Sequence, residues 1–210
     1  MDHARFRSYL NAIDERVTQF ATIRSVYHDK REGEAHVDVY ILDFTLDVQP
    51  RIVLLTVGCG LVRRGRQAAV ELAMVLPATW PLTAKALKRP AVFWPFAWLR
   101  FLGANVPRLP WGPLPADLIP IRSDPRQPRV TRFEGALGVP GDWITAAFET
   151  PIMFEGTEVS VTALIPLDAD ELAWAAARGE AAGDGEALAN LLADMDGDPL
   201  VIDEHRHSFI

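Results

Sequence analysis

The sequence AVELAMVLP at residues 69–77 predicts a β-strand that Pro77 ends, because it is apolar except at Glu71. Two more strands are expected before it. Residues 51–57, RIVLLTV, are nearly all apolar and rich in β-branched side chains, which is typical of a central strand buried on both faces. In residues 36–42, HVDVYIL, apolar and polar side chains alternate, which predicts a strand with one wetter face.

Helical patterns flank these strands. Apolar residues recur at spacings of three and four from Phe6 to Phe20, which predicts an amphipathic first helix. Residues 90–102 contain the densest aromatic cluster of the chain and predict a helix that Pro90 opens and that is buried on several sides. Two later helices are expected at 171–178, with Asp168 or Asp170 as the N-cap, and at 186–195.

The rest of the chain completes an α+β arrangement. Residues 132–139 and 158–165 read as strands, whereas residues 103–128 contain seven prolines and predict a long irregular loop. Strands clustered in this order among helices predict a mixed β-sheet flanked by helices. We expect residues 1–210 to form a single domain, ending in a polar tail over residues 198–210.

Composition excludes several classes of function. The chain has 210 residues, 49% of them hydrophobic, and a net charge of −7, which predicts a globular, soluble protein. An acidic chain is a poor partner for nucleic acids and for anionic membranes. No signal peptide and no apolar run of membrane-spanning length are visible, so we expect a cytoplasmic protein that is a monomer or a weak dimer.

Few residues suggest chemistry. Cys59 lies in a Gly-Cys-Gly turn after a strand and could act as a nucleophile if His28 or His36 reached it, but a lone cysteine there is more often a small core side chain. The turn lacks the third glycine and the lysine of a phosphate-binding loop. We therefore expect no catalytic residue, no cofactor and no metal; an enzyme that uses Cys59 or His36 stays open as an alternative.

Several motifs together resemble the suppressor of fused family. Residues 36–40, HVDVY, resemble its His-x-Asp-Ile-Tyr strand, and residues 71–80, ELAMVLPATW, resemble its Glu-Leu-x-Met-x-Leu-Pro-x-x-Trp segment. Residues 165–172 are similar to its closing Pro-Leu-x-x-x-Glu-Leu motif. The matches run in order from about residue 26 to residue 192, while the loop around Trp111 departs from the family pattern.

The resemblance implies an α/β sandwich that binds another protein and is not an enzyme. Animal relatives hold a zinc-finger transcription factor in hedgehog signalling through a protein with an additional C-terminal domain, which we do not expect here. Bacterial single-domain relatives are similar to immunity proteins against polymorphic toxins, and a small acidic binder fits that class. A second alternative is a regulatory module that captures a peptide by strand addition. The residues expected to contact a partner are Arg63, Arg64, Arg66, Trp111, Asp117 and Arg122.

Overall fold

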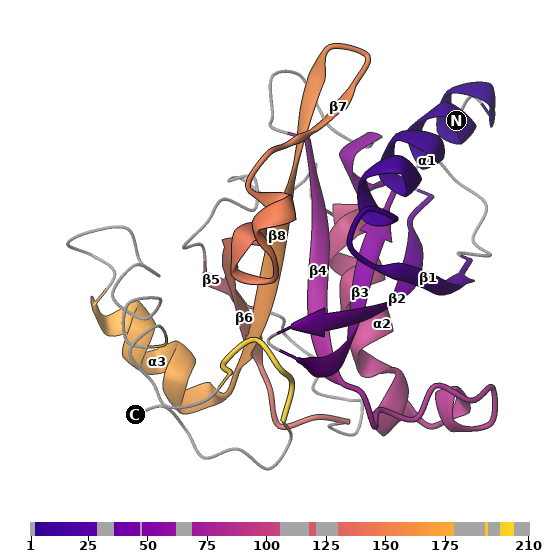
Figure 1. Cartoon of the computed structure of the whole chain (residues 1–210). Coiled ribbons are helices and arrows are strands. Elements are labelled where there is room, and N and C mark those ends of the chain that lie inside the picture. Colours follow the sequence, from indigo (N-terminus) through magenta and orange to yellow (C-terminus); the bar gives the residue numbers. More distant parts are fainter. Residues whose placement is uncertain are drawn as a thin grey trace.

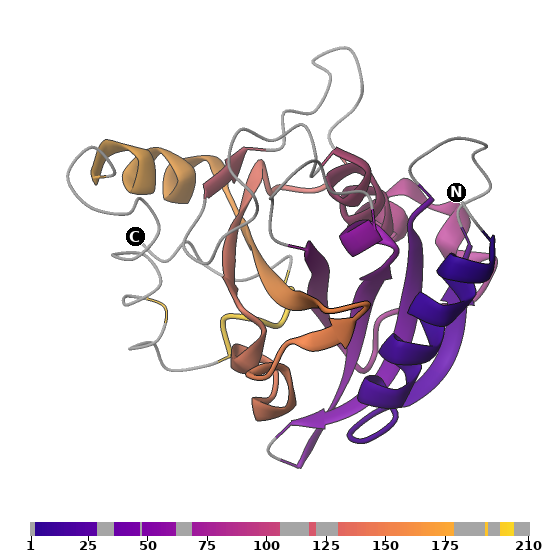
Figure 2. The same cartoon turned by 90° about the horizontal axis from the view of Figure 1, so that it is seen from above.

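Helices on both faces of one β-sheet define the architecture. In the computed structural model, helix α1 (His3–Val17) covers one face of the sheet and helix α2 (Pro90–Asn105) covers the other (Figure 1, Figure 2). Helix α3 (Ala169–Arg178) follows the last strand, β8. The structure describes residues 3–28, 36–46, 48–61, 69–105, 118–120, 130–178, 192 and 198–203.

The sheet is mixed, which confirms the predicted α+β class. Within the described residues, seven strands follow the order β1-β2-β3-β4-β8-β6-β5, and β7 pairs with β8. The β4–β8 pair is parallel, whereas the other strand pairs are antiparallel. The strands are β1 (Thr22–Tyr27), β2 (Asp38–Leu46), β3 (Gln49–Val57), β4 (Ala69–Pro77), β5 (Leu118–Pro120), β6 (Gly135–Pro140), β7 (Ile152–Phe154) and β8 (Thr157–Leu167); the short 3-10 turns are η1 (Cys59–Leu61), η2 (Ala86–Lys88), η4 (Gly141–Trp143) and η5 (Ala146–Phe148).

Alternation along the central strands divides the core in two. On β3, Val53 and Leu55 pack on the α1 side, whereas Ile52 and Leu54 pack on the α2 side. The same alternation continues along β4. Because both faces are covered, the wetter face expected for residues 36–42 is wrong: Asp38 and Tyr40 are both buried.

Residues 198–203, the described part of the tail expected to be polar, join the sheet through a bridge at Val201. Strands β4 and β8 pair only from Ala69 to Ala73 of β4. Farther along β4, Val75 forms a parallel bridge with Val201, and the Ile202 N–H donates to the Val75 carbonyl at 2.9 Å. Leu200 and Ile202 are buried in opposite halves of the core, so this segment helps to close the sheet beside β4.

Helix α2 confirms the predicted position and corrects the predicted burial. Trp94 and Phe96 are buried, and Pro95 lies inside the helix. Phe101, which belongs to the aromatic cluster expected to be buried on several sides, is 55% exposed. No helix in the described part of the chain is long and apolar enough to cross a membrane.

The predicted cap of the following helix is confirmed at Asp168. Its carboxylate accepts hydrogen bonds from the Asp170 N–H at 3.1 Å and the Glu171 N–H at 3.0 Å. The Glu171 side chain accepts in return from the Asp168 N–H at 2.8 Å, which completes a capping box. The helix expected at 186–195 lies outside the described residues except for Leu192, which is buried in the α1-side core.

Candidate functional site

The most polar feature of the interior is the Glu71 carboxylate, which β4 directs toward α1. Tyr9 on α1 donates its hydroxyl hydrogen to Glu71 Oε1 at 2.6 Å. Thr56 on β3 donates to Oε2 at 2.5 Å and accepts from the Leu72 N–H at 2.7 Å. The carboxylate therefore joins a helix and two strands at one buried point.

Three backbone N–H groups complete this cluster. Gly58 and Gly60 donate to Glu71 Oε1 at 3.0 Å each, and Cys59 donates to Oε2 at 3.3 Å. A Cβ atom on Gly60 would lie 2.4 Å from the Tyr9 hydroxyl oxygen, and Gly58 has a φ of +108°. Both glycines are thus required for the turn to close around the carboxylate.

Two opposing effects set the ionisation of Glu71. Burial raises its pKa to about 7, and the hydrogen bonds from Thr56, Tyr9, Gly60 and Gly58 lower the pKa without cancelling that rise. Burial, together with the nearby Glu71, also raises the pKa of Tyr9. Glu71 is fully buried. Its raised pKa therefore does not make it a catalytic acid, because the carboxyl group cannot contact a substrate.

Cys59 is sealed in the same region. Its side chain is 1% exposed, and its thiol donates to the Gly103 carbonyl at 3.6 Å. Burial, with the charge of Glu71, raises the pKa of Cys59 well above its usual value, which disfavours the reactive thiolate. The structure supports the interpretation of Cys59 as a core side chain and deprives the enzyme alternative of its best nucleophile.

The two histidines considered as bases are engaged elsewhere. His28 Nδ1 lies 3.0 Å from Asp38 Oδ2, and His36 Nε2 lies 3.0 Å from Asp38 Oδ1. The ring of Phe6 packs edge-on against the His36 ring at 5.3 Å between centroids. In the described part of the chain, no three His, Cys, Asp or Glu side chains converge to hold a metal ion.

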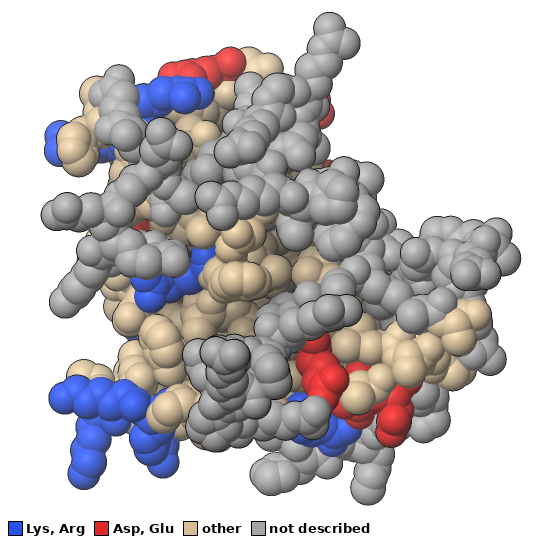
Figure 3. Space-filling view, turned by 180° about the vertical axis from the view of Figure 1, so that it is seen from behind, with Lys and Arg blue, Asp and Glu red and all other residues tan. Residues whose placement is uncertain are grey.

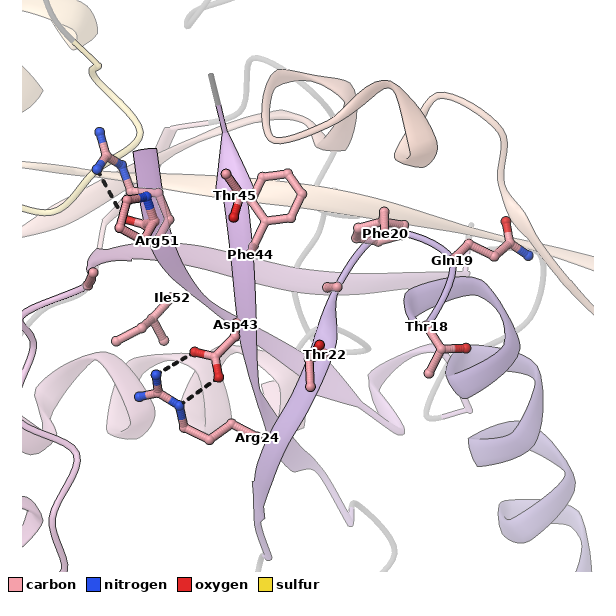
Figure 4. Close-up of a pocket in the computed structure, with 13 residues that line it drawn as sticks. Thr18, Gln19, Phe20, Thr22, Arg24, Asp43, Phe44, Thr45, Arg51 and Ile52 are labelled. Carbon is pink, nitrogen blue, oxygen red and sulfur yellow. Dashed lines mark hydrogen bonds and ion pairs between the residues drawn. The ribbon is translucent and has the colours of Figure 1, made fainter. Parts of the chain in front are cut away.

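A hollow of about 550 Å³ lies where α1 leads into β1, beside the ends of β2 and β3 (Figure 4). Arg24 and Asp43 line the hollow and point toward each other, with Arg24 Nη2 2.5 Å from Asp43 Oδ1 (Figure 4). Arg51 has Asp198 as its partner, at 3.7 Å. Because each cation already has a carboxylate, the hollow presents no unbalanced charge that would select a ligand.

Among the described residues, no second strand lies beside β1 at the outer edge of the sheet. Strand β1 is the terminal strand of the sheet order, and within the described residues it pairs only with β2. A register shift between Ile23 and Ser25 interrupts this pairing. An unpaired strand edge presents backbone donors and acceptors that another chain can bind, although an irregularity of this kind disfavours such pairing.

The residues predicted to contact a partner, Arg63, Arg64, Arg66, Trp111, Asp117 and Arg122, all lie outside the described residues. The role of Glu71 was missed by the sequence reasoning. The signal for it was a carboxylate between Val70 and Leu72 in an otherwise apolar strand, since a buried charge needs several partners.

Comparison with known proteins identifies a family. The family model described as Suppressor of fused protein (SUFU) matches residues 33–207. No curated protein and no solved structure matches the chain.

Proposed function

The chain belongs to the suppressor of fused family, whose members are protein-binding regulators and generally not enzymes, and on this premise we propose that it is an immunity protein that binds and neutralises a toxin. It would act in the cytoplasm as a single domain, like the bacterial single-domain members. The proposed contact residues are Arg63, Arg64 and Arg66, which form a basic stretch of the sequence, with Trp111, Asp117 and Arg122.

The burial of the reactive groups supports binding over catalysis. Cys59 and Glu71, the thiol and the acid that lie together, are both closed off from solvent, and their hydrogen bonds go to the protein itself. A catalytic acid or nucleophile has to reach a substrate. In this fold the pair instead fixes a turn against α1.

Growth rescue tests the proposal directly. Toxin genes near this gene would be expressed in a sensitive host with and without the chain, and the purified proteins would be tested for a complex. We expect one toxin to be neutralised through a stable complex. Failure to recover any specific protein partner from the native host, together with a gene neighbourhood free of toxins, would contradict the proposal.

The mutations Arg64→Glu and Trp111→Ala test the proposed contacts. Each should weaken the complex, whereas Glu158→Gln, at an exposed position on β8, should leave it unchanged. Equal affinity of all three variants would place the contact surface elsewhere on the chain.

The open side of β1 favours a second candidate function, the capture of an extended peptide by strand addition. A partner strand there would protect β1 amides from hydrogen exchange. The measurement compares the exchange of residues 22–27 in the free chain and in the complex. Unchanged exchange in a saturated complex would exclude this mode of binding.

A further inference from the structure

The outward side of α2 is an apolar stripe that the fold leaves partly exposed. Ala97 and Phe101 are exposed, and Phe93 and Ala104 are partly exposed. These residues follow one another at spacings of four, four and three, so they lie on one face of the helix. Arg100, the one charged residue between Pro90 and Asn105, follows Ala97 by three residues and precedes Ala104 by four, so it lies on the same face as the stripe. A stripe of this spacing and width matches the apolar face of another helix.

Three cations lie directly before this stripe. Lys85, Lys88 and Arg89 are exposed, and the ion pairs found among the described residues use other cations. Figure 3, which views the molecule from the α2 side, shows blue side chains gathered at the lower left with no red beside them, and above them a tan surface that a second blue group interrupts. The basic cluster and the apolar stripe thus form adjoining parts of one surface.

The position of these cations does not help the fold. They precede the N-terminus of α2, where the helix dipole places partial positive charge, and the first turn of α2 has no acidic residue to offset them. Cations at this end of a helix are unfavourable. An acidic partner would relieve that repulsion, whereas water and salt only screen it.

We propose that this surface, Lys85, Lys88 and Arg89 together with the stripe Phe93, Ala97, Phe101 and Ala104, docks an amphipathic helix whose apolar face ends in a cluster of acidic residues. The proposal rests on the protein-binding function proposed above and adds the kind of segment that the partner presents. A nucleic acid would pair its phosphates with the cations but would find no such contact along the apolar stripe. With 16 residues, α2 is about 24 Å long, enough for a partner helix of similar length.

Two synthetic helical peptides test the chemistry of this surface. The acidic probe has about 16 residues, with leucines at spacings of three and four and glutamates in the turn at one end; the basic probe has lysines in place of those glutamates. Binding is measured by fluorescence anisotropy at about 0.1 M salt, where surface charges still act over short distances. We expect the acidic probe to bind about tenfold more tightly than the basic probe, as several exposed ion pairs would give.

Charge reversal then inverts the preference. The triple variant Lys85→Glu, Lys88→Glu, Arg89→Glu should bind the basic probe more tightly than the acidic one. Its melting temperature should not fall, because the new acidic residues suit the N-terminus of α2. A structural role for these cations would instead lower the melting temperature.

Phe101→Ser should weaken both probes, whereas the matched control Met153→Ser, at a 58% exposed apolar residue on β7, should weaken neither. Equal affinity for the two probes, absence of binding, or equal effects of Phe101→Ser and Met153→Ser would overturn the proposal. A further result would also overturn the proposal: binding to phosphatidylserine vesicles that depends on Phe101, together with peptide binding that shows no charge preference. The surface would then recognise a membrane.

A native complex separates this proposal from the broader one. If a partner is recovered equally well by the wild-type chain and by the triple variant combined with Phe101→Ser, the docking surface is wrong and the protein-binding function stands. If the probes bind with the expected charge preference and no partner protein is recovered, the surface stands and the immunity function is wrong.

Discussion

Replacing Glu71 with glutamine should change how the stability of the protein depends on pH. In the native state burial raises the pKa of Glu71 from 4.5 to about 7, so between these values the native state holds a proton that the unfolded chain has lost. The stability contributed by protonated Glu71 is therefore fully present below about pH 4.5 and is lost as the pH rises through about 7. The difference corresponds to about 3 kcal/mol in the free energy of unfolding.

Urea denaturation followed by tryptophan fluorescence measures this change, since the chain has six tryptophans. Midpoints from about pH 4.5 to about pH 8 give the free energy of unfolding for the wild type and for Glu71→Gln. Glutamine keeps the shape of the side chain and does not titrate. The wild type should lose about 3 kcal/mol relative to the variant across this range. Glu158→Gln, at an exposed glutamate, is the control and should follow the wild type.

Two results would refute this reasoning. Parallel pH curves for the wild type and Glu71→Gln would mean that Glu71 does not titrate in this range. A wild type that gains stability over the variant with rising pH would mean that the five hydrogen-bond donors around the carboxylate outweigh its burial.

Three further substitutions or probes test other parts of the fold. Val48 is 92% exposed and has a φ of +62°, a backbone conformation that asparagine tolerates better than valine. Val48→Asn should therefore raise the free energy of unfolding by about 1 kcal/mol, as measured by thermal unfolding. A loss of stability would show that Val48 is not strained. Asp168→Ala should cost about 1 kcal/mol by removing the α3 cap, whereas Asp168→Asn should cost less; equal losses in urea denaturation would point to the ion pair with Arg132 instead. Cys59 should react with a thiol reagent only as fast as the protein unfolds, and rapid labelling of the native chain would contradict its burial.

Periodicity could predict the central elements because their patterns are local. The apolar runs of β3 and β4 and the aromatic cluster of α2 each identify an element within a single stretch of sequence. Strand β1 reads TIRSVY and was missed, because it is short, half exposed and interrupted by a register shift. The segment around Val201 was missed for another reason: its partner is Val75, and no local pattern reports a pairing so distant in the sequence.

The buried cluster around Glu71 shows the same limit at a smaller scale. A carboxylate in an apolar strand indicates that donors must surround it. The donors come from Tyr9 on α1, Thr56 on β3 and the turn that contains Cys59, three segments that only the folded chain brings together. The Gly-Cys-Gly sequence left a nucleophile open only as an alternative to a core cysteine, and its glycines serve to bring backbone N–H groups to the carboxylate.

Helix α2 shows what an apolar pattern leaves open. A helix that is apolar on several sides is normally buried on those sides, and this predicted burial for the aromatic cluster that includes Phe101. Folding alone does not explain the 55% exposure of that ring, because a polar residue there would leave the packing of Trp94 and Phe96 intact. Folding does not explain the cations before Pro90 either, since they oppose the helix dipole. Both features are unfavourable in the free chain and adjoin each other, and an acidic amphipathic helix docked along α2 would relieve both at once.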